Sequence, residues 1–267
     1  MGSATREAVV AAKAALAARP AAATLAVGDE IFSAARAVGA SAQLLGALTD
    51  TSADPKDKAD LVDAVFGSLG SEARALIAVL AQSRWSAQSD FLEGIEELGL
   101  RIMASSVDGS SDSAIDIPAE LFAFGQLVAS NAELELAVGS KLGDPAAKAA
   151  LVSRLLEGRA SAQTISILGH LVRQPLGRRI GALLRHAADI VADQSSLAIA
   201  TVTVASPLAQ AQLDRLRSGL AKKYGDLRIN QVVDPELIGG VRVAVGHDVI
   251  DDSVATRLKE LRLQLAG

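Results

Sequence analysis

Residues 54–62 read DPKDKADLV, and residues 144–152 read DPAAKAALV ninety positions later. In each segment the aspartate can accept hydrogen bonds from the free amides of a helical first turn. The proline that follows suits the first helical position, where no N–H group is needed. The closing leucine and valine begin an apolar stripe. The segment therefore predicts the start of a helix, and its recurrence predicts two helical units in tandem.

The same offset of ninety connects other parts of the two regions. The further pairs are Glu30-Ile31-Phe32 with Glu120-Leu121-Phe122, Val38 with Val128, Ala42 with Ala132, Leu44 with Leu134, and Ser71 with Ser161 as helix caps. Chance similarity between alanine-rich stretches explains the alanines, but not one offset across a cap, a proline and several apolar stripes. We predict a helical bundle over 1–107 and a second, repeat-like bundle over 108–192, with a polar linker at 107–113. The second bundle lacks a counterpart of the helix predicted over 3–18.

The hydrophobic period changes near residue 197, which indicates a third domain over 193–267. The predicted elements are a strand over 197–204, a helix over 207–224, strands over 227–233 and 240–245, and a final helix capped by Asp251 or Ser253. The fold class is therefore mainly α with a C-terminal α/β unit. Two tandem helical bundles precede a small strand-helix-strand-strand-helix domain.

Composition limits the classes of protein. Half of the residues are apolar, so a sizeable core is available, and the formal net charge of −5 argues against a nucleic-acid binder. The absence of cysteine excludes disulfides, thiolate catalysis and cysteine-ligated metals. The longest uncharged run, 194–213, contains Pro207 and three glutamines, so it is not expected to span a membrane. We expect any membrane attachment to be indirect, through other proteins.

Motifs for catalysis are missing from the sequence. It has no phosphate-binding loop and no Gly-x-Ser-x-Gly nucleophile motif. His170, His186 and His247 fall in three separate elements without metal-ligand spacing, so packing or solvation is the expected role of each. We predict no catalytic residue, no metal and no cofactor.

Two further features leave alternatives open. The basic cluster of Arg173, Arg178, Arg179 and Arg185 is expected to be a solvated helix face, with contact to an acidic partner helix as the alternative. Trp85 is expected to be a half-buried core anchor rather than an interface hot spot.

The C-terminal run 233–246, VDPELIGGVRVAVG, resembles the signature of the δ subunits of F-type ATP synthases and of the related oligomycin-sensitivity-conferring protein. Residues 200–208 and Tyr224-Gly225 lie where that family has a strand and a Tyr/Phe-Gly pair. The resemblance is close from Arg178 onward and loose over the first bundle. His247 departs from the family, which has an acidic residue there. The signature residues carried over as possible interface are Asp234, Pro235, Leu237, Ile238, Gly239, Gly240, Gly246, Asp251 and Ser253.

The resemblance implies a non-catalytic peripheral-stalk subunit at the cytoplasmic face of the cell membrane. Its N-terminal bundle would hold the α subunits and its C-terminal domain would hold subunit b. Because the family's first helix is retained only in the first bundle, we place the α-binding groove there. The candidate groove residues are Val9, Val10, Leu16, Leu76 and Leu80.

The alternative function is a ligand-responsive regulatory or scaffold protein whose small α/β unit senses a metabolite. It predicts a gain in thermal stability with a small molecule, whereas the stalk function predicts a tight complex with subunit b. An enzyme is a third class, but the sequence offers no cluster of polar residues for it.

Overall fold

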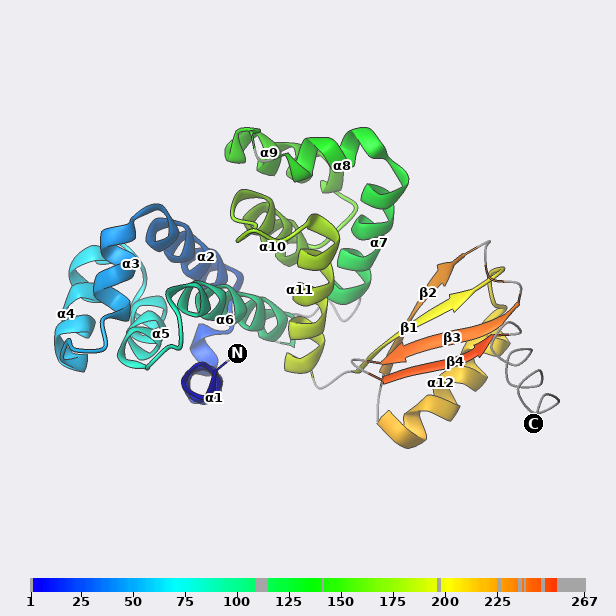
Figure 1. Ribbon diagram of the computed structural model, residues 1–267, viewed down its shortest axis with the longest axis horizontal. Helices are drawn as coiled ribbons and strands as arrows, with labels where there is room; N and C mark the ends of the chain where they lie inside the picture. Colours follow the sequence, from blue (N-terminus) through cyan, green and yellow to red (C-terminus); the bar gives the residue numbers. More distant parts are fainter. Residues whose placement is uncertain are drawn as a thin grey trace, which may run out of the picture. The chain divides into compact units, whose positions relative to one another are not determined.

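A computed structural model describes residues 2–108, 115–140, 142–195, 198–224, 227–234, 237, 239–245 and 248–253. The chain divides into two compact units, Met1–Val191 and Ala192–Gly267 (Figure 1). The first unit is helical and the second contains a sheet. The predicted fold class, mainly α with a C-terminal α/β unit, is confirmed.

Both helical repeats lie in the first unit. The elements of the first repeat are α1 (Ser3–Ala17), the short 3-10 helix η1 (Pro20–Ala22), α2 (Leu25–Ala40), α3 (Ala42–Thr49), α4 (Pro55–Val65), α5 (Ser71–Gln82) and α6 (Gln88–Asp108). Those of the second are α7 (Ile117–Ser130), α8 (Ala132–Gly139), α9 (Pro145–Leu156), α10 (Ala162–Arg173) and α11 (Ile180–Gln194). Helices α8 and α9 start ninety residues after α3 and α4, as the sequence predicts.

Equivalent side chains cap equivalent helices in the two repeats. Asp54 accepts a hydrogen bond from the Lys56 amide and Asp144 accepts one from the Ala147 amide, so both Asp-Pro pairs begin helices. Ser161 caps α10 through the Thr164 amide, as predicted.

The prediction that Ser71 caps α5 is wrong. Ser71 is the first helical residue, and Gly70 occupies the cap position without a side-chain bond. The Gly70 amide instead donates to the Glu30 carboxylate at 3.0 Å. In the second repeat the Ser161 amide donates to Glu120 at 3.1 Å. Glu30 of α2 thus binds the start of α5 in the first repeat, and Glu120 of α7 binds the start of α10 in the second. The two glutamates are ninety positions apart.

The two repeats pack together within the first unit. Helix α10 contacts both α2 and α6. Helix α6 is buried on every side near its end, where Leu98, Leu100, Ile102 and Met103 are buried and Arg101 pairs with Glu97. A helix that is apolar all round needs cover on every side. In the structure, residues 1–191 form one compact unit. The predicted division into 1–107 and 108–192 is a division between sequence repeats, and it stays a prediction.

In the part of the second unit that the structure describes, a mixed sheet packs against the helix α12. Its elements are β1 (Ala198–Val204), α12 (Gln210–Tyr224), β2 (Leu227–Val233), β3 (Gly240–Val245) and β4 (Asp248–Ser253), and the strand order is β2-β1-β3-β4. Strands β1 and β2 are parallel, which the α12 crossover permits, and the other pairs are antiparallel. Alternate residues of β1 and β3, among them Val202 and Val243, form a core with Leu216 and Leu220 of α12.

Strand β4 was not predicted. Asp251 and Ser253, expected at a helix cap, instead lie within this strand, where Arg242 pairs with Asp251 and Gly240 with Ser253. The final helix predicted after them lies outside the described residues.

A search of the described part of the chain finds no individual helix with both the length and the hydropathy of a membrane span. The bent pair formed by α2 and α3 passes the same test only when the two helices are joined.

The turn before β3 requires glycine. Gly239 and Gly240 have φ angles of 132° and 86°, which side chains with a Cβ rarely adopt. We predict that Gly240→Val destabilises the second unit by about 1–3 kcal/mol, measured by hydrogen exchange of its strands. The control is Gly219→Ala inside α12, where an added methyl meets no atom within 4 Å and should stabilise by about 0.5–1 kcal/mol. Equal hydrogen exchange in Gly240→Val and in the wild type would contradict the requirement for glycine in this turn.

Candidate functional site

The predicted groove residues lie on two neighbouring helices, but most of them face inward. Helices α1 and α5 are in contact, which brings the five positions together. Leu16, Leu76 and Leu80 are buried in the core. Val9 is partly buried and packs against that core. Val10 is 65% exposed, so it is the groove residue best able to touch a partner directly.

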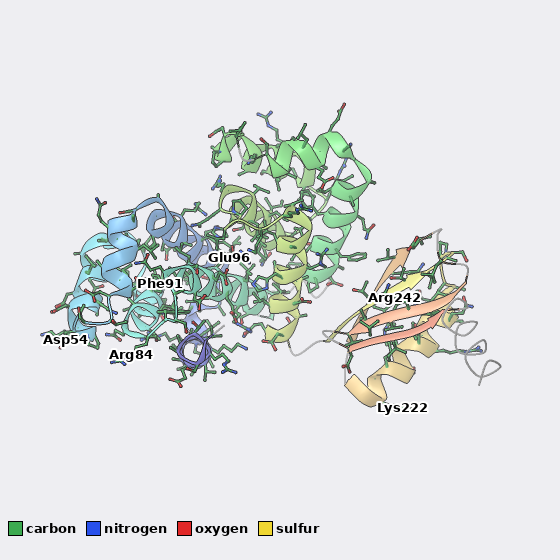
Figure 2. The ribbon with its side chains drawn as sticks, in the orientation of Figure 1. Asp54, Arg84, Phe91, Glu96, Lys222 and Arg242 are labelled. Atoms are coloured by element: carbon green, nitrogen blue, oxygen red, sulfur yellow. The ribbon has the colours of Figure 1, made fainter. Side chains whose placement is uncertain are left out.

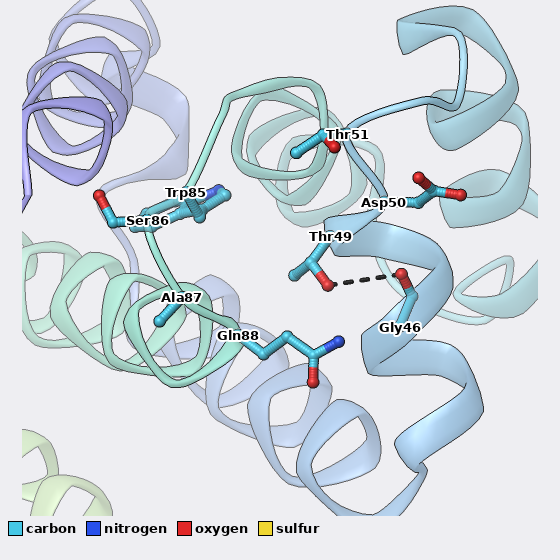
Figure 3. A pocket seen from close by; sticks show the side chains of 8 residues that line it. All are labelled: Gly46, Thr49, Asp50, Thr51, Trp85, Ser86, Ala87 and Gln88. Carbon is cyan, nitrogen blue, oxygen red and sulfur yellow. Dashed lines mark hydrogen bonds between the residues drawn. The ribbon is translucent and has the colours of Figure 1, made fainter.

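An open hollow of about 420 Å³ lies where the end of α3 meets the start of α6 (Figure 3). Its lining residues are Gly46, Thr49, Asp50, Thr51, Trp85, Ser86, Ala87 and Gln88. The Thr49 hydroxyl donates to the Leu45 carbonyl at 2.7 Å, and the Asp50 carboxylate accepts from the amide and hydroxyl of Ser52. These bonds lower the pKa of Asp50 below its ordinary value. The side chains of Thr49 and Asp50 therefore serve the local turn, while the Ser86 amide donates to the Thr5 hydroxyl at 3.2 Å.

Trp85 anchors the wall between this hollow and the core. Its indole N–H donates to the Leu80 carbonyl at 2.8 Å, and its ring meets Phe91 edge-on at 5.6 Å between centroids. The residue belongs to the core cluster of the first repeat, as the sequence predicts.

The C-terminal signature builds the connection between β2 and β3. The Asp234 amide donates to the Val204 carbonyl at 2.9 Å, and the Leu237 amide donates to the Asp234 carbonyl at 3.1 Å. Gly239 and Gly240 complete the turn. Pro235, Ile238 and Gly246 lie outside the described residues. The described signature residues thus have an architectural role, and their role as interface stays a prediction.

A buried polar cluster joins the two repeats. Glu96 of α6, which is 1% exposed, forms an ion pair with Arg178, in the segment between α10 and α11. Its other carboxylate oxygen faces His170 of α10, with 3.6 Å between Oε2 and Nε2. Figure 2 shows Glu96 inside the helical unit. One carboxylate of the first repeat therefore meets two basic groups of the second.

The His170 ring is fixed on three sides. It stacks on Phe32 of α2, with 4.3 Å between centroids and 8° between planes. Its Nδ1 lies 3.3 Å from a guanidinium nitrogen of Arg36, which can only donate. Nδ1 therefore accepts, and the proton of the neutral ring is on Nε2, where it points at Glu96.

Burial and charge set the protonation of this cluster. Burial lowers the pKa of His170, and the charges of Arg36 and Arg173 lower it further, against the opposing effect of Glu96. Burial raises the pKa of Glu96, but the nearby His170 and Arg178 outweigh burial and leave it below the ordinary value. At neutral pH the cluster holds an anionic Glu96, a cationic Arg178 and a neutral His170.

Further polar contacts cross the same junction. The Gln174 amide donates to the Ala35 carbonyl at 3.1 Å, and the Gln163 amide donates to the Ser106 hydroxyl at 3.3 Å. The Ser166 hydroxyl donates to Asp29. Because each bond joins residues more than fifty positions apart, these contacts fix the orientation of α10 on α2 and α6.

The expectation of a fully solvated basic cluster is wrong for Arg178. Arg173, Arg179 and Arg185 are exposed, but Arg178 is drawn inward by Glu96. Sequence reasoning also missed Glu96, because its neighbour Glu97 makes the pair look like a solvated helix face. The available signal was the run from Leu98 to Met103, whose apolar residues are too continuous for a helix with an exposed side.

Among the residues with assigned positions, no group of three or more potential metal-ligating side chains is found. What the units present instead are helix and sheet surfaces around two cores. Surfaces of this kind can carry docking contacts spread over several elements.

Comparisons with known proteins identify the protein family. Residues 108–265 match the ATP synthase delta (OSCP) subunit family. The chain is 54% identical over 267 residues to ATP synthase subunit delta of Leifsonia xyli subsp. xyli, with both chains covered completely. It is 36% identical to the corresponding subunits of Arthrobacter sp. (strain FB24), with full coverage of both chains, and of Streptomyces avermitilis, with coverage of 90% of this chain and 89% of the relative.

The chain belongs to the ATP synthase delta (OSCP) subunit family. It is a peripheral-stalk subunit of an F-type ATP synthase, a structural component of a membrane-associated complex. The resemblance stated from the sequence is therefore confirmed. The family match starts at residue 108, well before Arg178, so the second repeat is part of the region that family members share.

The buried cluster predicts a pH dependence of stability. Because His170 has a folded-state pKa below its ordinary 6.5, unfolding takes up a proton there, and stability falls as the pH drops below about 6.5. The contribution reaches at most about 1.4 kcal/mol per pH unit. The measurement is urea unfolding of the full chain between pH 7.5 and 5.5, a window above the ordinary 4.5 of Glu96.

The matched variant is His170→Leu, since Leu80 stands at the equivalent place in the first repeat. Its free energy of unfolding should depend less on pH than that of the wild type. The control His186→Gln should retain the wild-type slope of unfolding free energy against pH. An unchanged slope in His170→Leu would show that this histidine does not couple folding to pH.

Proposed function

We propose that the chain is a non-catalytic stator link between the α subunits at the top of the catalytic head and subunit b. The helical unit holds an N-terminal helix of α, the second unit holds the end of b, and the complex lies at the cytoplasmic face of the cell membrane. The family and the presence of two compact units support this proposal. Two separate attachment points hold the link in the complex more tightly than one, because each keeps the other at high effective concentration.

The contact with α is placed on α1 in the first repeat. An amphipathic partner helix recognises a groove through a few apolar anchors. Val10 offers such an anchor on the outer surface of α1, while Leu16, Leu76 and Leu80 support the groove from the core. The second repeat is the competing location, since the family match includes it.

The contact with b is placed on the face of the sheet opposite α12. The buried residues Val243 and Val245 of β3 point toward α12, so Arg242 and Ala244 point to the other face. Val249 of β4 pairs with Ala244 and is 55% exposed. This face combines a charge with exposed apolar surface, which suits a partner helix.

The alternative function, a ligand-responsive regulator, is not favoured. Family membership accounts for the α/β unit without a metabolite, and in the hollow beside Trp85 the side chains of Thr49 and Asp50 are used by local turns. The observation that carries the stator proposal is the family match across the second repeat and the α/β unit.

We predict that Val10→Asp weakens binding of a fluorescent peptide from the N-terminus of the synthase's own α subunit at least about tenfold. A buried charge and a lost apolar contact each oppose docking. The measurement is fluorescence anisotropy with the full chain. Val65→Asp, another exposed valine of the first repeat, is the matched control and should bind as the wild type does. Unchanged affinity in Val10→Asp would remove α1 from the interface.

A further inference from the structure

The second repeat exposes three leucines on α7, on α8 and in the segment after α8. Leu127 is 43% exposed, Leu136 is 73% exposed and Leu142 is 99% exposed. Single exposed apolar residues are common on soluble proteins. The residues at the same places in the first repeat show whether the fold itself needs leucine there.

The first repeat is an internal control for these positions. Ninety residues earlier the chain has Ala37, Gly46 and Ser52. Helices α2 and α3 follow one another as α7 and α8 do, and α3 and α8 begin at equivalent positions. Each of the four helices begins with a side-chain cap, from Thr24, Ser41, Asp116 and Asn131 in turn. The fold is therefore made equally well with small residues at all three places. Leucine at all three places in one repeat serves something other than folding.

Helix α8 carries apolar residues on two sides. Val138 is buried against the second repeat, whereas Leu136 points to solvent. Its neighbour Glu135 is exposed, while the equivalent Leu45 of the first repeat is partly buried and packs against the core. A helix that is apolar on both sides is expected to be covered on both sides.

The same surface is acidic. Residues 116–140 contain Asp116, Glu120, Glu133 and Glu135 and no lysine or arginine. Glu133 and Glu135 are exposed in the first turn of α8, and Glu133 is a surface neighbour of Leu136 because the two are three positions apart. Leu127 and Leu136 thus have only acidic residues as charged neighbours along this stretch of sequence, whereas Leu142 directly follows Lys141.

We propose that four exposed residues, Leu127 of α7, Glu133 and Leu136 of α8 and Leu142 in the segment after α8, together form a surface that docks an amphipathic helix of a partner protein. The partner helix has a leucine-type apolar face flanked by lysine or arginine. The exposed leucines supply the apolar anchors and the two glutamates pair with the basic flanks. The proposal goes beyond the attachments to α and b, and it does not depend on either.

Two other occupants fit the surface less well. An anionic membrane would be repelled by Glu133 and Glu135. A second copy of this chain, docked through the same surface, would place these glutamates against their own equivalents. A basic helix is the occupant that both the charge and the leucines favour.

The test measures binding of two synthetic 18-residue helical peptides to the full chain by fluorescence anisotropy. Both peptides carry leucine at positions i, i+3, i+4 and i+7, and their polar faces contain lysine in one and glutamate in the other. The variants are Leu136→Gln with Leu142→Ser, and separately Glu133→Lys with Glu135→Lys. Val65→Ser is the control, as an exposed apolar residue of the first repeat. Circular dichroism checks that every variant is folded.

We expect the lysine peptide to bind the wild type and Val65→Ser equally. In the double leucine variant the affinity for the lysine peptide should fall by on the order of tenfold or more. In the charge-reversed variant this affinity should also fall, and it should depend less on salt concentration. Equal binding of the glutamate peptide, or unchanged affinity in the leucine variant, would overturn the proposal. Self-association of the wild type that disappears in the leucine variant would also overturn it, as would leucine-dependent binding to anionic vesicles without peptide binding.

Discussion

The ion pair of Glu96 with Arg178, together with the His170 ring between Glu96 and Arg36, is the constraint on which the helical unit depends. Glu96 belongs to the first repeat and both of its partners belong to the second. A buried carboxylate is tolerated only with such partners, since an uncompensated charge in an apolar interior is strongly destabilising. The stacking of His170 on Phe32 adds an apolar contact at the same point. Two sequence repeats are thereby held as one body, which suits a subunit that transmits force.

The repeats have kept their framework and changed their surfaces. Glu30 and Glu120 tie equivalent helices together, and Lys58 and Lys148 are both largely buried at equivalent positions. In contrast, His170 stands at the position equivalent to Leu80, and leucines stand where the first repeat has three small residues. The first difference belongs to the junction between the repeats, and the second to the exposed leucines of the second repeat. The two repeats thus share a helical framework and differ in their contacts.

The sequence was informative wherever the signal was local. Asp54-Pro55 and Asp144-Pro145 predict helix starts because capping depends on adjacent residues, and Gly239-Gly240 predicts a turn because only backbone conformation is involved. Strand β4 was missed because Asp251, Asp252 and Ser253 favour caps over strands, and pairing with β3 overrides that preference. Arg178 was misjudged for a related reason. Whether a side chain faces solvent depends on distant partners, such as Glu96, that no local pattern identifies.

The central claim is that the two repeats fold as a single cooperative body. Native-state hydrogen exchange of the full chain, followed by mass spectrometry at increasing urea, tests it most directly. The account predicts that core amides of α6 and α10 report the same opening free energy and the same dependence on urea. Exchange of α7 to α11 through a separate opening of lower free energy, with α2 and α6 still protected, would contradict it.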